Sequence, residues 1–304
     1  MRARIVVLIV VLFTATYALV GFVSDSMPGQ SSDEEARDRP SAASNSSQPT
    51  EDRLDDISAA TAAMPVGDLP GWRQVFTEDF TDGDVPIGEF PDRTYRARWS
   101  ANYFDGTPDT AAQTLKTKSG YYPSKVLSVH DGLLDMYLHT ENGISMGAAP
   151  SPRFEKGGKR PFNSQTYGRY SVRFKADELK GFKLAWLLWP DSKQWPEDGE
   201  IDFPEGDLSK TIYAALHGPG EEDTMLDQFR TTSTFTSWHI ATIEWSPDRV
   251  EFFLDGKLIG TSTSAIPDTP MHYILQTESC LTTCPDPDTR GHVYVDWVAI
   301  WAKD

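Results

Sequence analysis

Cysteine is almost absent from this chain of 304 residues, which contains only two, Cys280 and Cys284. Two cysteines are too few for a disulfide-rich scaffold, and no third cysteine or nearby histidine completes a zinc site. Outside the cytoplasm the two thiols can oxidise, because the three residues between them allow a small loop to close. We therefore expect a disulfide between them, with two buried thiols as the alternative.

Basic residues are also scarce, since 28 lysines and arginines stand against 45 aspartates and glutamates, a formal net charge of −17. Nucleic-acid binding depends on Lys and Arg side chains that neutralise phosphates, so this balance argues against a nucleic-acid partner. The overall negative field also disfavours sulfated or carboxylated polysaccharides, although a local basic patch could override it.

The N-terminus carries a long apolar stretch, Ile5 to Val23, directly after the basic segment Met1-Arg2-Ala3-Arg4. As a helix it would span about 28 Å, close to the thickness of a bilayer core. Because the arginines come first, the rest of the chain is expected outside the cytoplasm. Residues 1–23 could be an uncleaved signal anchor or a cleaved signal peptide. The protein is accordingly expected to be held at the membrane by residues 5–23 or to be secreted.

The next segment, residues 24–66, has almost no large apolar side chains and is rich in Ser, Asp, Glu, Ala and Pro. A chain of this composition cannot bury enough surface to order itself. The composition predicts a disordered acidic tether, with a loose pro-segment as the alternative. Residues 67–304 are left as one folded domain.

Amphipathic helices of 12 residues and internal repeats are both missing from residues 67–304. Short alternating runs recur instead, separated by turn signals. Asp131-Gly132 and Asp255-Gly256 each join two such runs, because Asp-Gly supplies the positive φ of a hairpin turn. Further strands are expected over residues 72–77, 167–174, 182–189, 212–217, 238–245, 272–277 and 292–301. Many short strands without alternating helices predict an all-β fold, a sandwich of two sheets.

The most informative segment is Glu200-Ile201-Asp202-Phe203-Pro204-Glu205. Acidic and apolar residues alternate as in a strand with one acidic and one apolar face. Proline within a strand is tolerated mainly at a bulge or an edge. One extra residue at Pro204 would return Glu205 to the face that carries Glu200 and Asp202. Three carboxyls that repel one another without obvious partners indicate a catalytic task.

Aromatic residues stand close to these acids in the sequence, namely Trp186, Trp189 and Trp195. Aromatic rings stack on the apolar faces of sugars while two carboxyls cleave the glycosidic bond. A solvated acidic edge strand is one alternative interpretation, and a calcium loop is another. A calcium loop of the EF-hand type needs a glycine at its sixth position and two flanking helices, and this strand pattern provides neither.

On these residues the chain resembles family 16 of the glycoside hydrolases, the retaining β-glucanases and galactanases. The resemblance covers roughly residues 70–302. The matching segments are Tyr167-Gly168-Arg169, Trp186-Leu187-Leu188, Gly199 to Glu205, His217, Trp238 to Gly256, and Asp296-Trp297-Val298. It implies a β-jelly-roll sandwich with a cleft across the concave sheet, in agreement with the strand pattern.

The resemblance also implies a role for each acid of the strand. Glu200 matches the family nucleophile, Glu205 the general acid/base, and Asp202 the acid that supports the nucleophile. It further implies sugar contacts from Trp186, His217, Gln276 and Arg169, with Gln276 in the place of a common asparagine.

Other site candidates follow from position. Glu278 shares a strand face with Gln276 by parity and could also touch sugar hydroxyls. Trp189 and Trp195 either extend the sugar platform or fill the core, and for Arg169 a surface salt bridge is the alternative. Candidate aromatics at the cleft rim, with packing as the alternative, are Trp99, Tyr121 and Tyr122.

A structural calcium ion is the one metal that the resemblance implies. Many family members bind it on the convex side with an aspartate that matches Asp296, helped by groups such as Glu78 or Asp79. No redox cofactor is expected.

We therefore expect a monomeric, extracytoplasmic, retaining endo-glycosidase that acts on a β-linked, largely neutral polysaccharide, above all a β-1,3-containing glucan. Two alternatives stay open, a cell-envelope transglycosylase and a non-catalytic carbohydrate-binding protein of the same fold. Asn102 to Gly106, Tyr121 to Val126 and Phe203-Pro204 depart from the usual laminarinase or lichenase patterns, so these residues do not identify the glycan.

Overall fold

Two β-sheets form most of the computed structural model, which describes residues 63–154, 164–222 and 225–304. The larger sheet has 10 strands: β1 (Trp72–Glu78), β3 (Ser119–Tyr121), β4 (Leu127–His130), β5 (Leu133–Glu141), β6 (Ile144–Gly147), β8 (Gly168–Ala176), β13 (His239–Ser246), β14 (Arg249–Leu254), β15 (Lys257–Ser262) and β17 (Arg290–Lys303). The smaller sheet has five: β9 (Phe182–Pro190), β10 (Glu200–Asp207), β11 (Thr211–His217), β12 (Met225–Thr234) and β16 (Met271–Ser279).

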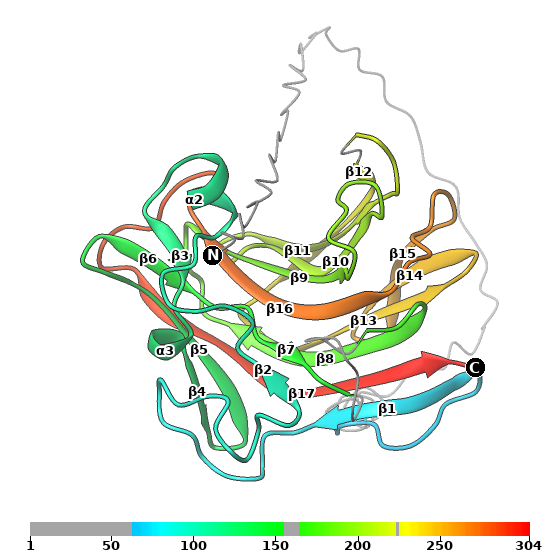
Figure 1. Ribbon diagram of the computed structural model, residues 1–304, viewed down its shortest axis with the longest axis horizontal. Helices are drawn as coiled ribbons and strands as arrows, with labels where there is room; N and C mark the ends of the chain where they lie inside the picture. Colours follow the sequence, from blue (N-terminus) through cyan, green and yellow to red (C-terminus); the bar gives the residue numbers. More distant parts are fainter. Residues whose placement is uncertain (1–62, 155–163, 223–224) are drawn as a thin grey trace, which may run out of the picture.

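The two sheets lie one above the other (Figure 1), with β9, β10, β11 and β16 over β8, β13 and β17. The strand order is β15-β14-β13-β8-β17-β5-β6-β3 in the larger sheet, where β1 pairs with β17 and β4 with β5. It is β12-β11-β10-β9-β16 in the smaller sheet. The remaining elements are short: β2 (Trp99–Ser100), β7 (Ser151–Pro152), α2 (Thr110–Thr114) and α3 (Pro123–Val126). The predicted jelly-roll-like sandwich is confirmed.

The core lies between the sheets and is dense in aromatic rings. Phe203 on β10 contacts Phe252 on β14 edge to face, with ring centroids 5.7 Å apart. Both rings are fully buried, as are most inward residues of both sheets. Burial of such large apolar side chains is the main favourable contribution to folding, and here it joins the acidic strand to the opposite sheet.

Both predicted hairpin turns are present. Asp131 and Gly132 have φ values of 53° and 70° between β4 and β5, and Asp255 and Gly256 have 52° and 74° between β14 and β15. All the strands expected from the sequence are found, with ends that differ by a few residues, whereas β2, β3, β6, β7 and β12 were not predicted. Strands this short or this exposed carry little periodic signal.

Cys280 and Cys284 form the expected disulfide directly after β16. The apolar segment 5–23 and nearly all of the tether lie outside the described residues, so the hypotheses on them stay predictions. Within residues 63–154, 164–222 and 225–304, the structure contains no helix long and apolar enough to cross a membrane.

One buried carboxylate of the larger sheet binds two histidines. Asp135 on β5 is 4 % exposed. His130 Nε2 lies 3.0 Å from its Oδ2, and His292 Nδ1 lies 2.9 Å from its Oδ1. The hydrogen bond to Asp135 is the main cause that raises the pKa of each imidazole. The folded state therefore favours the protonated form of both rings.

This arrangement predicts a pH-dependent stability. Because the folded pKa values are raised, the histidines contribute fully below their unfolded pKa of about 6.5, and the contribution is lost as pH rises through the folded values. Asp135→Asn should therefore destabilise more at pH 5 than at pH 8, by about 1–2 kcal/mol, given the partial exposure of both rings. Thermal unfolding at both pH values measures it.

Asp131→Asn is the comparison variant: Asp131 binds one of the two histidines, His130, and its side chain is 89 % exposed, so its pH-dependent loss should be smaller. Asparagine also tolerates the positive φ of this turn. An equal loss of stability at pH 5 and pH 8 for Asp135→Asn would contradict the histidine linkage.

Candidate active site

β10 carries its three acids on the face of the smaller sheet that points away from the core, here called the outer face. Asp202 pairs with Ala215 of β11 and Glu205 with Tyr213, so Phe203 and Pro204 of β10 together oppose the single residue Ala214 of β11. The extra residue is the bulge predicted at Pro204. Glu200 lies opposite His217 on the same side.

The acids are nearly buried, with exposed fractions of 8 % for Glu200, 3 % for Asp202 and 7 % for Glu205. Burial raises the pKa of Glu200 to about 7, against the opposing charge of His217. Burial and then the charges of Glu200 and Glu205 raise the pKa of Asp202 well above its usual range. A hydrogen bond between the two carboxyls also raises the pKa of Asp202 and lowers that of Glu200, so the surroundings favour a proton on Asp202 over one on Glu200. The arrangement keeps a protonated acid beside an ionisable one.

A lysine that the sequence analysis missed binds the third acid. Lys183 on β9 places its Nζ 2.5 Å from Oε1 of Glu205. Burial opposes the charge of Lys183, but the nearby Glu205 raises its pKa well above the usual value. Lys183 has the same strand parity as Leu187 and Trp189, which was the available signal for its place on the outer face.

β16 contributes the two polar residues expected from it. Gln276 lies opposite Ala185 and Glu278 opposite Lys183, so both project from the outer face. The hydroxyl of Tyr121 lies 2.9 Å from Gln276 Oε1 and 3.2 Å from Glu278 Oε1. Tyr121 of β3 thus connects β3 to the polar residues of β16. Because β3 is only three residues long, the sequence did not predict this contact.

The ring of Trp195 lies between two other rings beside the acids. It stacks on Trp189 with centroids 6.3 Å apart and planes 14° apart, and it lies 6.3 Å from His217. His217 Nε2 is 3.9 Å from Asp202 Oδ2. Trp189 packs with Leu187 on the outer face rather than in the core between the sheets. Trp189 therefore lies outside the core, and a sugar platform of Trp189 and Trp195 stays a prediction.

Two predicted sugar contacts are wrong. Trp186 is fully buried between the sheets, where its ring contacts Phe174 of β8 edge to face at 5.1 Å, because its strand parity points it inward. Arg169 lies on β8 in the other sheet, where its guanidinium binds Glu244 and stacks over Trp301. Of the candidate rim aromatics, Trp99 is also buried in the core, and Tyr122 packs against that core.

Two of the three candidate calcium ligands, Asp296 and Glu78, are bound to arginines, whereas Asp79 accepts hydrogen bonds from Thr81. Asp296 forms an ion pair with Arg173. Glu78 accepts hydrogen bonds from Arg98 at 2.8 Å and from Trp99 Nε1 at 3.1 Å. These carboxylates do not fit a calcium site. Within the described residues, one group offers three donor atoms within 4.8 Å that could hold a metal ion, namely Glu200, Asp202 and His217.

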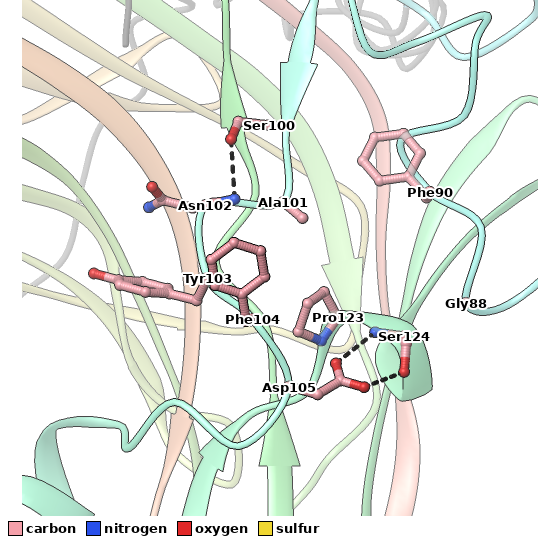
Figure 2. A pocket seen from close by; sticks show the side chains of 10 residues that line it. All are labelled: Gly88, Phe90, Ser100, Ala101, Asn102, Tyr103, Phe104, Asp105, Pro123 and Ser124. Carbon is pink, nitrogen blue, oxygen red and sulfur yellow. Dashed lines mark hydrogen bonds between the residues drawn. The ribbon is translucent and has the colours of Figure 1, made fainter. Parts of the chain in front are cut away.

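A surface pocket of about 450 Å³ lies near the site but not at the acids. Figure 2 shows it between Phe90, Tyr103 and Pro123, with Asp105 hydrogen-bonded to the backbone and side chain of Ser124. Tyr103 stacks on Tyr121 with centroids 4.5 Å apart, which connects the pocket to the outer face.

The sequence profile of glycosyl hydrolases family 16 matches residues 135–299. The chain belongs to this family. The matched segment contains all three acids of β10, and the resemblance described from sequence is confirmed.

Curated relatives include a β-glucanase of Rhodothermus marinus, 30 % identical over 107 residues, which cover 31 % of this chain and 37 % of the relative. A β-glucanase of Bacillus subtilis is 26 % identical over 122 residues, 39 % of this chain and 49 % of the relative. A glucan endo-1,3-β-glucosidase of Cryptopygus antarcticus is 24 % identical over 133 residues, 38 % and 47 %. The chain spans about half or less of the length of these relatives.

Solved structures share the fold. The laminarinase catalytic domain of Thermotoga maritima has a TM-score of 0.61 and 21 % identity, over 77 % of this chain and 100 % of that one. The endo-β-1,3(4)-glucanase SCLam has a TM-score of 0.61 and 18 % identity, over 79 % and 95 %. At these identities the likeness establishes the sandwich fold alone.

The side chains of Trp186 and Trp189 lie on opposite faces of β9, which gives a first prediction for this site. Trp186→Ala should destabilise the fold by roughly 3–5 kcal/mol, because a fully buried ring leaves a cavity. Trp189→Ala should cost clearly less, because Trp189 is half-buried on the outer face. Urea unfolding of both variants measures the difference, and equal losses would contradict the assignment of Trp186 to the core.

The raised pKa values of Glu200 and Asp202 predict that the site costs stability. The folded state binds more protons than the unfolded state, so stability falls as pH rises above the unfolded pKa of about 4. Asp202→Asn should therefore raise the melting temperature at pH 8 and change it less at pH 4.5. Asp268→Asn, at an exposed position, is the control. A lower melting temperature of Asp202→Asn at pH 8 would contradict the assignment.

Proposed function

We propose that residues 67–304 form a retaining endo-glycosidase that hydrolyses a β-linked glucan by double displacement. The observation that carries the proposal is the bulge of β10, which puts Glu200, Asp202 and Glu205 on one face, nearly buried. Two carboxyls about 5–5.5 Å apart are what a retaining mechanism requires, and neighbouring acids can reach that spacing. No redox cofactor is needed.

In the first half-reaction, ionised Glu200 attacks the anomeric carbon of the bound sugar. An oxygen of Glu200 forms a bond to that carbon while the bond to the glycosidic oxygen breaks. Glu205 gives its proton to the departing oxygen, so the leaving sugar departs as a neutral alcohol. The hydrogen bond from Asp202 fixes the orientation of Glu200 before the attack.

In the second half-reaction, a water molecule attacks the same carbon. Glu205, now ionised, takes a proton from this water, and the bond between the carbon and Glu200 breaks. Glu200 returns to its ionised form and Glu205 to its protonated form. Two inversions at one carbon leave the β configuration unchanged.

A neutral β-1,3-containing glucan is the substrate that we favour. The curated relatives are named β-glucanases and a glucan endo-1,3-β-glucosidase, and a related fold is that of a laminarinase. The rings of Trp189 and Trp195 offer a stacking surface for pyranoses beside the acids. The net charge of −17 disfavours an anionic polymer.

We infer that the enzyme works outside the cytoplasm, secreted or held at the membrane by residues 5–23. The disulfide supports this, because disulfides persist in oxidising compartments. It is expected to act as a monomer, since one chain supplies every group of the proposed site.

Replacement of each catalytic acid tests the mechanism. Glu200→Ala and Glu205→Ala should each lower reducing-sugar release from a β-1,3-glucan by roughly 10³-fold, because each removes a required group. With an activated aryl glycoside and added azide, Glu205→Ala should form a β-glycosyl azide, since azide replaces water in the second step. Glu200→Ala should form the α-glycosyl azide by direct attack. NMR distinguishes the two products.

Glu178→Ala, an exposed acid, is the control. Full reducing-sugar release by Glu200→Ala would overturn the role of Glu200, whereas no release above background by either the wild type or the variant would favour a carbohydrate-binding protein. Longer products in the presence of an acceptor sugar would instead identify the wild-type chain as a transglycosylase.

A further inference from the structure

Lys183 contacts the proposed acid/base residue on one side only. Its Nζ lies 2.5 Å from Oε1 of Glu205. The other oxygen, Oε2, is buried and has no hydrogen-bond partner within the described part of the chain. The two oxygens of Glu205 are therefore not equivalent.

This asymmetry has a chemical consequence. An ammonium group donates a proton to the oxygen that it binds, so Oε1 cannot carry a proton that points toward Nζ. When Glu205 is protonated, its proton belongs on Oε2. That oxygen is the one left to meet the glycosidic oxygen or the attacking water.

A second carboxyl, on β16, acts on Lys183 electrostatically. Lys183 lies across from Glu278 of β16, whose charge acts on it. Glu278 accepts a hydrogen bond from Thr110, and the hydroxyl of Tyr121 lies 3.2 Å from the same oxygen. A nearly buried Glu278 with two fixed partners therefore presents a fixed carboxyl on the β16 side of Lys183.

The remaining neighbours of Glu205 do not duplicate this contact. Glu200 and Asp202 are acids on the same strand, and Tyr213 of β11 carries no positive charge, although its side chain hydrogen-bonds to Glu205. Arg230 of β12 stacks over the ring of Tyr213 with its guanidinium 5.2 Å from the centroid. Among the ion pairs of the described residues, Glu205 has one cationic partner, Lys183.

We propose that Lys183 is a positioning residue that binds Oε1 of Glu205 and thereby makes Oε2 the oxygen that exchanges the catalytic proton. The proposal rests on the function proposed above. Lys183 does not touch the reacting atoms and acts only through Glu205.

Leaving-group dependence tests this role. Lys183→Met should lower kcat/KM on laminarin, a β-1,3-glucan, by roughly 10- to 100-fold, because a misplaced acid protonates the leaving oxygen poorly. On a 2,4-dinitrophenyl glycoside of a β-1,3-linked glucose trisaccharide, kcat/KM should change by less than about threefold, because this leaving group departs without a proton. The full chain is used throughout.

Three further variants make the result interpretable. Lys183→Arg keeps a cationic donor and should recover most of the loss on laminarin. Lys180→Met makes the same change at a nearby exposed lysine and should leave both rates as in the wild type. Glu205→Gln should show the same split between the two substrates, more strongly. If circular dichroism shows that Lys183→Met is unfolded, Lys183→Gln is used in its place, with the same expected rates on the two substrates.

The outcomes separate the two proposals. Equal losses on both substrates, or no loss on laminarin, for the Lys183 variant would overturn the positioning role while Glu205→Gln still shows the split. An unchanged laminarin rate for Glu205→Gln would instead overturn the proposed function.

Discussion

Repulsion among three nearly buried carboxyls on one strand is the constraint on which the rest of the site depends. Glu200, Asp202 and Glu205 share a face because one extra residue follows Asp202 in β10. Burial raises the pKa values of Glu200 and Asp202, so the strand holds protons that exposed acids would release. The core rings beneath it, such as Phe203 against Phe252, provide the stability that such an arrangement requires.

The surroundings resolve this repulsion differently at the two ends of the strand. At Glu200 the charge of His217 and a hydrogen bond with Asp202 both lower the pKa that burial raises. At Glu205 a lysine supplies a full positive charge at 2.5 Å. The two glutamates of this strand, although chemically identical, therefore have different partners: an acid and a histidine at Glu200, and a lysine at Glu205.

Local sequence rules predicted the parts of this site that depend on one strand. Alternation and a proline were enough for the bulge of β10, and parity was enough for Glu278 beside Gln276. Parity alone does not say which side of a strand faces the core, so Trp186 was placed on the wrong side. The predicted sugar contact of Arg169 was wrong for a related reason: the sequence did not show which of the two sheets contains its strand. Contacts between distant strands, such as Lys183 with Glu205 or Tyr121 with Glu278, leave no local signal.

The alternation of side chains on β9 links the buried position of Trp186 to the chemistry of the site. Lys183, Leu187 and Trp189 face outward, while Trp186 faces Phe174 of the other sheet. A shift of one residue in register would exchange the two faces and bury the lysine in the core. Burying an unpaired ammonium costs far more free energy than burying an aromatic ring. Lys183, which contacts Glu205, therefore also favours the observed register of β9. Packing of the core and placement of the acid/base carboxyl are thus set by a single strand register.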